Sequence, residues 1–106
     1  MFRISYTDRA LSDIDAIHAH IARDSLVRAD AVVRRLLNVT RILRSAPRAG
    51  HRRPEYGPDI RTLAVYPFVV FYRLLDDDRI AQVVRVIDGR RDLGTVFFSP
   101  LVAQAA

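Results

Sequence analysis

Three hydrophobic runs follow one another closely between residues 60 and 87, where the sequence reads IRTLAVYPFVVFYRLLDDDRIAQVVRVI. The runs cover residues 60–66, 68–75 and 79–87, and all are rich in the Val, Ile, Phe and Tyr residues that strands favour. Pro67 separates the first two runs, because proline cannot donate a ladder hydrogen bond. The sequence Asp76-Asp77-Asp78 is typical of a turn. Connections this short predict an antiparallel meander of three strands.

Upstream of the meander the hydrophobic period changes from two residues to that of a helix. Apolar residues recur at spacings of three and four, which predicts one amphipathic helix to about residue 24 and a second over residues 25–46. Thr7 or Asp8 can cap the first helix, and Ser25 can cap the second. The link between them is a residue or two, so we expect an antiparallel helical hairpin.

The remaining segments complete an α+β fold. Residues 2–6 are predicted to form an opening strand, residues 47–58 an irregular loop with three Pro and two Gly, and residues 95–98 a brief extended piece. The expected order is strand, helix, helix, strand, strand, strand, with the helical hairpin on one face of a mainly antiparallel sheet. Residues 1–98 should form a single domain, and residues 99–106 a C-terminal tail.

Composition narrows the class of protein. The chain has 106 residues, of which 50% are hydrophobic, so it can bury a core and is not disordered as a whole. It has no Cys, which excludes disulfides and thiolate metal sites. It has no apolar run long enough to span a membrane and no signal-peptide core at its start, so we expect no membrane partner and a cytoplasmic protein. The net charge is +5, and all 17 basic residues are Arg.

Strand alternation assigns side chains to the two faces of the predicted sheet. With a three-residue turn at Asp76-Asp77-Asp78 and Pro67 at the centre of the preceding turn, the expected opposite pairs are Phe71 with Val83 and Leu63, Val69 with Arg85, and Arg61 with Arg73. The face expected to meet the helices carries Thr62, Ala64, Phe68, Val70, Tyr72, Leu74, Ile80, Val84 and Val86. The other face carries Arg61, Arg73 and Arg85 among Leu63, Val65, Val69, Phe71 and Val83.

This second face is too apolar for a plain solvent face, so we expect something to cover it. One possibility is that the C-terminal residues fold back over it, through Val96, Phe97, Phe98 and Leu101. The other is that a partner macromolecule covers it.

A basic segment lies in the second predicted helix and the loop after it. Residues 31–54 contain seven Arg and no acidic residue. A charge run of this kind is usually a solvated helix face. An unneutralised cluster also creates a long-range positive field, whose natural partners are an acidic protein segment or a phosphate backbone. Arg34, Arg41 and Arg44 are the candidate contacts.

Catalytic and metal-binding motifs are missing from the sequence. His18 and His20 are two residues apart on a helix and point to nearly opposite sides, and His51 stands alone in a loop. There is no phosphate-binding glycine loop, no EF-hand spacing and no nucleophile elbow. We therefore assign no catalytic residue, no cofactor and no metal.

The order of elements and several short motifs resemble the ParE branch of the RelE/ParE superfamily, small toxins of bacterial type II toxin–antitoxin pairs. The resemblance spans about residues 3–98. Its most specific parts are the helix start Ala10-x-x-Asp13-Ile14 and the segment Val86-Ile87-Asp88-Gly89-Arg90-Arg91-Asp92. Pro47-x-x-Gly50, Arg61 and Tyr72-Arg73 add to it.

The resemblance implies two competing activities. RelE-type members are ribosome-dependent endoribonucleases, whereas ParE-type members are taken to poison DNA gyrase and are not known to cleave RNA. Cutting RNA at its own 2′-OH needs a base, an acid and cations for the phosphorane. The RelE-type pattern for these groups falls here on Ile60, Thr62, Val69 and Phe97, which lack the charge or the hydroxyl, and only Arg90 or Arg91 fits.

The sequence therefore predicts a ParE-like toxin that inhibits DNA gyrase by binding and is neutralised by a ParD-like antitoxin in a hetero-oligomer. It would serve in growth arrest and plasmid stabilisation. The alternative is a RelE-like ribonuclease acting on ribosome-bound mRNA, which would use Arg61, Arg73 and Arg91. A structural role for Arg91, paired with Asp88 or Asp92, is also open. The expected residues for target or antitoxin binding are Arg34, Arg41, Arg44, Arg61, Phe71, Arg73, Arg85, Arg90 and Arg91.

Overall fold

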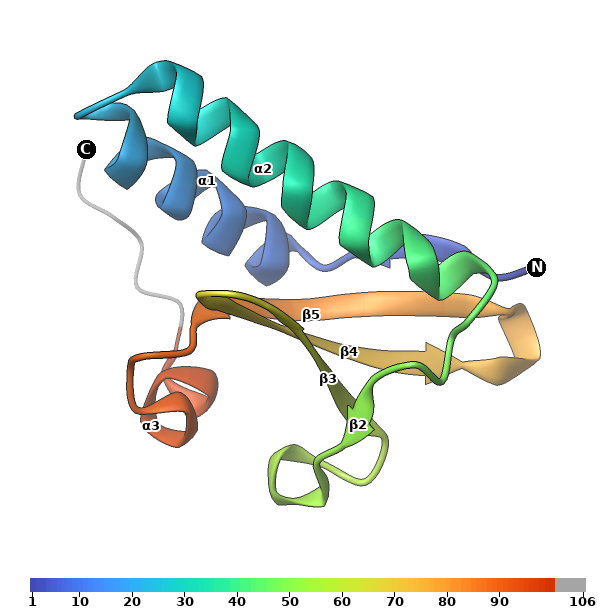
Figure 1. The fold of residues 1–106 in the computed structure, drawn as a ribbon. Coiled ribbons are helices and arrows are strands. Elements are labelled where there is room, and N and C mark those ends of the chain that lie inside the picture. Colours follow the sequence, from blue (N-terminus) through green and yellow to red (C-terminus); the bar gives the residue numbers. More distant parts are fainter. Residues whose placement is uncertain (101–106) are drawn as a thin grey trace.

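The computed structural model describes residues 1–100 as two helices packed on one face of a five-stranded sheet, with a short third helix on the other face (Figure 1). The main elements are β1 (Arg3–Tyr6), α1 (Asp8–Ala22), α2 (Leu26–Thr40), β2 (His51–Arg52), β3 (Ile60–Val65), β4 (Phe68–Leu75), β5 (Ile80–Asp88) and α3 (Leu93–Phe98). Single 3₁₀ turns cover Arg41–Arg44, Pro54–Tyr56 and Asp76–Asp78. The predicted α+β class and element order are confirmed. Most of the expected tail, residues 101–106, lies outside the described residues.

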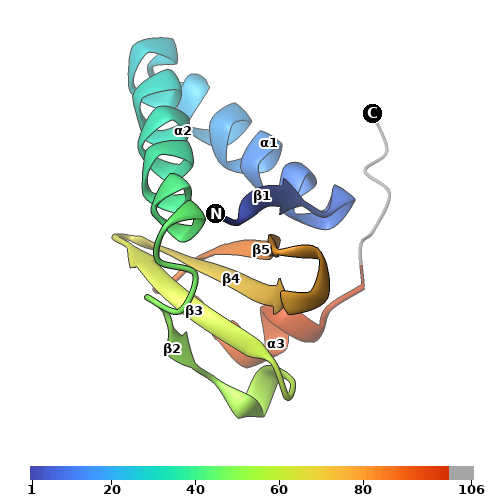
Figure 2. The same ribbon diagram turned by 90° about the vertical axis from the view of Figure 1, so that its right-hand side faces the viewer.

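The sheet has the order β1-β5-β4-β3-β2. β2, β3, β4 and β5 pair antiparallel, and β1 pairs parallel with β5 (Figure 2). The predicted meander of three strands is therefore present. β2, a two-residue strand at one edge, was not predicted.

The helical hairpin forms where the capping residues allow it. The Thr7 side chain accepts a hydrogen bond from the amide of Ala10, and the Ser25 side chain accepts one from the amide of Arg28. Each bond satisfies a helix-terminal N–H that has no partner within the helix. α2 ends at Thr40, earlier than expected, and the chain continues as the 3₁₀ turn Arg41–Arg44.

The core lies between the hairpin and the sheet. Its centre is fully buried Tyr72 and Val70 of β4, beside Leu36 of α2 and Leu43 of the 3₁₀ turn. The remaining buried members of this cluster are Ala10, Ile14, Val65, Phe68, Ala81, Val83 and Val86.

The predicted strand register is wrong at both turns. The β3–β4 turn has two residues, Tyr66 and Pro67, because Val65 pairs with Phe68. The β4–β5 turn contains a fourth residue, Arg79, which adopts a left-handed conformation with φ of 52°. The two-residue turn pairs Arg61 with Tyr72 and Leu63 with Val70. A bulge after Val83 shifts the register of β5 once more, so that Tyr72 lies opposite Val83 but Phe71 lies opposite Arg85.

Because a slip of one residue moves a strand's side chains to the other face, the register decides the core. On β4 the predicted helix-facing residues are correct. On β3 and β5 the residues that reach the helix-side core are Leu63, Val65, Ala81 and Val83, in place of Thr62, Ala64, Ile80 and Val84. Val86 keeps its predicted face because the bulge restores the parity.

Candidate partner-binding surface

The sheet face opposite the hairpin is partly covered by α3. Residues 95–98 were expected to be extended, but they belong to this helix, which Asp92 caps by accepting from the amide of Thr95 at 3.3 Å. Phe97 packs against Phe71 of β4 with a ring-centroid distance of 4.9 Å, and Tyr56 contacts Phe71 at 5.0 Å. Phe98 extends this aromatic cluster through both Tyr56 and Phe97. Phe71 is 0% exposed as a result.

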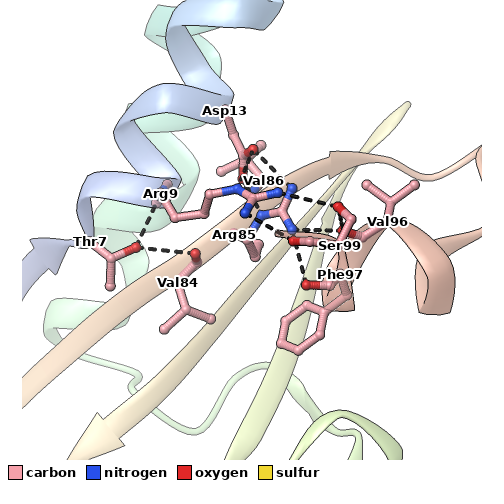
Figure 3. Close-up of polar contacts among 10 residues, drawn as sticks. Thr7, Arg9, Asp13, Val84, Arg85, Val86, Val96, Phe97 and Ser99 are labelled. Atoms are coloured by element: carbon pink, nitrogen blue, oxygen red, sulfur yellow. Dashed lines mark hydrogen bonds and ion pairs between the residues drawn. The ribbon is translucent and has the colours of Figure 1, made fainter. Parts of the chain in front are cut away.

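An ion pair holds α1, β5 and α3 together (Figure 3). The Arg85 guanidinium donates to both carboxylate oxygens of Asp13, at 2.7 and 3.0 Å, and Asp13 also accepts from the amide of Val86 at 2.9 Å. The far side of the same guanidinium donates to the carbonyls of Val96 and Phe97 near the C-terminal end of α3, at 2.8 and 3.1 Å. The carbonyls in the last turn of a helix have no partner within the helix and carry partial negative charge, so a guanidinium there is stabilising.

Two expected binding residues are therefore interior residues. Phe71 is fully buried beneath α3, and Arg85 is only 6% exposed, with its guanidinium bonded to Asp13 and to α3. Of the two expected covers for this face, the chain itself supplies the one over Phe71, through Phe97, which Phe98 contacts in turn. Leu101, the last residue of the expected cover, lies outside the described residues.

Arg61 lies on the other face of the sheet, contrary to the prediction. Directly opposite residues in an antiparallel pair share a face, and its partner is core residue Tyr72. The Arg61 guanidinium donates to the carbonyl of Gly50 at 3.1 Å, and the Tyr72 hydroxyl donates to the carbonyl of Pro47 while accepting from the amide of Gly50, both at 2.8 Å. Burial raises the pKa of the Tyr72 hydroxyl. The pair anchors the loop after α2.

Three further arginines that were expected to bind a partner are exposed, namely Arg73 on β4 and Arg90 and Arg91 after the end of β5. Arg73 donates to the side chain of Gln82 at 2.8 Å. The Arg90 guanidinium donates hydrogen bonds of 2.6 and 2.9 Å to the two carboxylate oxygens of Asp88. These hydrogen bonds lower the pKa of Asp88 to about 2. The ion pair with Asp88 that was considered for Arg91 is formed by Arg90. Arg91 contributes its backbone amide to the carbonyl of Asp88, and its side chain is exposed.

Arg61, Arg73 and Arg91, the residues expected to act together in the ribonuclease alternative, do not lie close enough to form one site. Arg61 and Arg73 lie on opposite faces of the sheet, since Arg61 pairs with Tyr72, the neighbour of Arg73. Arg91 follows the C-terminal end of β5, whereas Arg73 pairs with Gln82 near its start. Asp88 lies six residues beyond Gln82 along the strand, a distance of about 20 Å.

The expected basic contacts on the hairpin are free in this structure. Arg34 on α2 and Arg41 and Arg44 on the following 3₁₀ turn are exposed, and none forms an ion pair within residues 1–100. Arg41 and Arg44 line a groove of about 400 Å³ between β1 and the end of α2, which we call the β1–α2 groove. Its other lining residues are Arg3, Ile4, Tyr6 and Leu37.

A second, larger groove of about 630 Å³ lies between α1 and the end of β5. Ile17, Ile21 and Phe68 give it an apolar interior, and charges of both signs, including Asp24 and Arg28, surround it. Together the two grooves give the hairpin side of the molecule two concave surfaces for a partner.

The described residues offer no other chemistry of note. His18 bonds to Asp30 at 2.7 Å and so links α1 to α2, and His20 contacts Arg23. Within residues 1–100, no three His, Asp or Glu side chains gather where they could hold a metal ion. In the same range no helix is long and apolar enough to cross a membrane.

Sequence reasoning missed the structural importance of Asp13 and Tyr72. Asp13 did carry a signal, because it is a charged residue beside Ala10 and Ile14 on the apolar side of α1. An acid in such a position needs a buried cation. Tyr72 gave no such signal, since a tyrosine in a hydrophobic strand looks like any other core residue.

Comparisons with known proteins identify the family. The family model described as "ParE toxin of type II toxin-antitoxin system, parDE" matches residues 4–93, which is most of the chain. This chain belongs to the ParE toxin family. It is 32% identical over 94 residues to Toxin ParE3 of Caulobacter vibrioides, covering 88% of this chain and 92% of that relative. The family expected from the residues is confirmed.

Solved structures extend the likeness of this ParE-family toxin to three dimensions. It matches a chain of the chromosomal ParDE toxin–antitoxin system of P. aeruginosa with a TM-score of 0.69 at 25% identity, covering 83% of this chain and 96% of the other. It also matches the intact E. coli RelBE toxin–antitoxin complex with a TM-score of 0.61, covering 86% and 100% of the two chains. At 19% identity, this second likeness shows the shared fold alone.

Proposed function

We propose that this ParE-type toxin acts by binding, that its target is DNA gyrase, and that a ParD-like antitoxin neutralises it. The match over residues 4–93 to a toxin family defined by its pairing with ParD carries the proposal. The target follows from the ParE-type resemblance of the sequence, and the antitoxin from the ParDE assembly of the relative in P. aeruginosa.

The arrangement of the arginines supports binding over bond chemistry. RNA cleavage would need a base, an acid and cations around one phosphate. Here Arg61 is bonded to the carbonyl of Gly50, Arg85 is buried, and Arg73 and Arg91 lie near opposite ends of β5. A catalytic group must reach the reacting atoms from a shared site, which these residues do not form.

The surface also suits a macromolecular partner. Arg34, Arg41 and Arg44 project from one side of the hairpin, and several large apolar side chains are exposed on the same two helices and turn, namely Leu11, Leu26, Val27, Leu37 and Ile42. Unpaired guanidinium groups beside exposed apolar side chains are typical of an interface with an acidic, amphipathic partner.

The target is tested with purified full-length protein and DNA gyrase in supercoiling and DNA-cleavage assays. We expect inhibition of supercoiling and accumulation of cleaved DNA, both prevented by the protein encoded in the neighbouring open reading frame. Absence of inhibition at stoichiometric excess would contradict gyrase as the target.

Induction in a susceptible bacterium tests the class of activity. We expect growth arrest with DNA breaks, and rescue when the neighbouring open reading frame is co-expressed. Mapping of mRNA ends is the second arm of the experiment. Cuts within ribosome-bound codons that disappear in Arg91→Ala would replace gyrase poisoning with the ribonuclease activity.

A further inference from the structure

Three arginines form a row along α2 and the 3₁₀ turn that follows it. Arg34 and Arg41 are two turns of an α-helix apart, so they lie on one side of the helix with about 10 Å between their backbone positions. In a 3₁₀ helix residues three apart lie above one another, which places Arg44 in line with Arg41, about 6 Å further along. We call Arg34, Arg41 and Arg44 the α2 arginine row.

The row lies on the solvent side of the hairpin. Leu36 of α2 and Leu43 of the turn are buried in the core, whereas the three arginines are exposed. Asn38, between the first two arginines, is exposed and polar. The sheet packs on the other side of the hairpin (Figure 1). A large partner can therefore reach the row from solvent without any change in the fold.

The positive charge of the row is not neutralised by the fold. None of the three arginines forms an ion pair within the described part of the chain, and residues 31–54 contain no acid. The nearest acid before the row on α2 is Asp30, which is bonded to His18 at 2.7 Å. A guanidinium group stays protonated in proteins, so the charge of the row is fixed. Arg3, which lines the β1–α2 groove with Arg41 and Arg44, adds a fourth charge beside its end.

The density of these charges favours a phosphate backbone over an acidic polypeptide. Duplex DNA carries one negative charge for about every 1.7 Å of its axis, so a row about 16 Å long faces several phosphates in any register. An extended polypeptide offers at most one charge for about every 3.3 Å. Phosphate contacts also need only cations and hydrogen-bond donors, which the row and Asn38 supply.

We propose that the α2 arginine row binds the phosphate backbone of duplex DNA without reading its sequence. The guanidinium groups donate paired hydrogen bonds to phosphate oxygens and displace counterions from the duplex. The binding site stands on the row alone. Its use rests on the proposed function in one respect: the DNA held by gyrase is the duplex that the toxin is expected to meet.

The test measures binding of the full chain to a short fluorescein-labelled DNA duplex by anisotropy at several salt concentrations. The logarithm of the affinity should fall with the logarithm of the salt concentration with a slope of about −0.9 for each phosphate neutralised, hence close to −3 for the row. A second duplex of unrelated sequence should bind within threefold of the first, because phosphate contacts carry no sequence information.

Neutral variants locate the site. Arg34→Gln/Arg41→Gln/Arg44→Gln should weaken binding at least tenfold and remove most of the salt slope, since each lost phosphate contact reduces the slope by about one. Arg34→Lys/Arg41→Lys/Arg44→Lys keeps the charges and should keep most of the slope. The lysine variant separates loss of charge from any effect of three substitutions on folding.

The matched control removes three charges elsewhere, in Arg23→Gln/Arg48→Gln/Arg52→Gln. All three positions are exposed and outside both grooves. Arg48 is already paired with Asp76, and Arg52 lies on β2, at the sheet edge opposite β1. We expect this variant to change the affinity less than threefold and the slope by less than one.

Three outcomes would overturn the proposal. The first is an equal loss of affinity in the glutamine variant and its control, which reduces binding to net charge. The second is a salt slope that the glutamine variant leaves unchanged. The third is a polyglutamate peptide that binds the row more tightly than the duplex does, which would make the row a surface for an acidic protein.

The binding assay contains no gyrase, so its outcome is independent of the proposed target. Loss of the DNA site with gyrase inhibition retained strikes only this inference. Binding of the duplex through the row without inhibition of gyrase strikes only the proposed target.

Discussion

At the residue scale, Asp13 and Arg85 are the charges on which the packing of α3 depends. They lie at the junction of three elements that are far apart in sequence, and the guanidinium satisfies two helix carbonyls as well as the carboxylate. A buried ion pair of this kind contributes little more to stability than apolar residues would in its place. Removal of only one member, however, leaves the other charge buried without a partner. The pair therefore specifies one arrangement of these elements.

The singly substituted variants test this role. Asp13→Asn and Arg85→Met should each lower the free energy of unfolding by about 3–5 kcal/mol, because each leaves an uncompensated polar group in the interior. The double variant Asp13→Asn/Arg85→Met should lose clearly less than the sum. Urea denaturation measures all three, with exposed Arg73→Met as a control within about 0.5 kcal/mol of the parent. Simple additivity of the two losses would contradict coupling.

Tyr72 links the core to the loop after α2, and its hydroxyl serves two backbone groups. Tyr72→Phe should lower the free energy of unfolding by about 1–3 kcal/mol, since the amide of Gly50 and the carbonyl of Pro47 lose their partner. Denaturation of Tyr66→Phe is the control, because Tyr66 is 79% exposed.

Gly50 is required at this anchor for reasons of space. A Cβ at this position would lie 2.6 Å from the carbonyl oxygen of Thr62 and 2.7 Å from the Tyr72 hydroxyl. Alanine at position 50 is therefore excluded unless the loop moves away from β3.

Asp88 gives a prediction of pH dependence. Its pKa of about 2, against 3.8 for the free group, reflects first the hydrogen bond from Arg90. Because the folded-state pKa is lowered, the stability from this contact is fully present above pH 4 and disappears as the pH falls towards 2. In Arg90→Gln the pKa should return towards 3.8, which an NMR titration of the carboxylate would measure. An unchanged pKa would show that another group holds it low.

At the element scale, the helices and strands were predictable and their register was not. Period and capping residues are local properties, so Thr7, Ser25 and the three hydrophobic runs predicted α1, α2 and β3–β5. The register depends on one residue in each turn. Neither the two-residue turn at Tyr66-Pro67 nor the left-handed Arg79 is marked by glycine or asparagine, the residues that usually signal such geometry.

The candidate site was predictable only where local sequence properties determine the position of a side chain. Arg34, Arg41 and Arg44 were located correctly because their exposure follows from the helical period. Arg61 was placed on the wrong face because its face depends on the register. Phe71 and Arg85 lie on the predicted face, but α3 covers them there. A run of Thr, Val and Phe in residues 95–98 favours a strand by propensity. The cap from Asp92 and the aromatic contacts with Phe71 override that preference.

The aromatic contacts of α3 are open to a direct test. Phe97→Ala removes the ring that covers Phe71, and because Phe97 is only partly buried we expect a loss of about 2 kcal/mol, below the range for a fully buried Phe. Amide hydrogen exchange in α3 should accelerate more than in β4. Phe98→Ala, at a ring that is 64% exposed, should have a smaller effect on both measurements. Equal acceleration throughout the molecule would show that α3 does not open separately.

At the scale of the whole molecule, the charges divide into those the fold uses and those it leaves free. Arg61 and Arg85 serve backbone carbonyls, and Arg48, Arg53 and Arg90 pair with acids on the surface. The free arginines are concentrated on the hairpin side, where Arg34, Arg41 and Arg44 are exposed. This separation gives the molecule a positive side that acts beyond contact distance.

Such a field should govern how fast the antitoxin is captured. We expect the association rate with the protein encoded beside this gene to fall steeply as salt is raised, because exposed charges are screened beyond about 8–10 Å at physiological ionic strength. Arg34→Glu/Arg41→Glu/Arg44→Glu should lower the low-salt rate by at least tenfold and flatten its salt dependence. Stopped-flow fluorescence measures both. Reversal of Arg48, Arg52 and Arg79, which are exposed and lie outside both grooves, is the control of equal net charge, and it should preserve most of the rate. If both triple variants slow association equally, net charge controls capture, and the position of the free arginines on the fold does not matter.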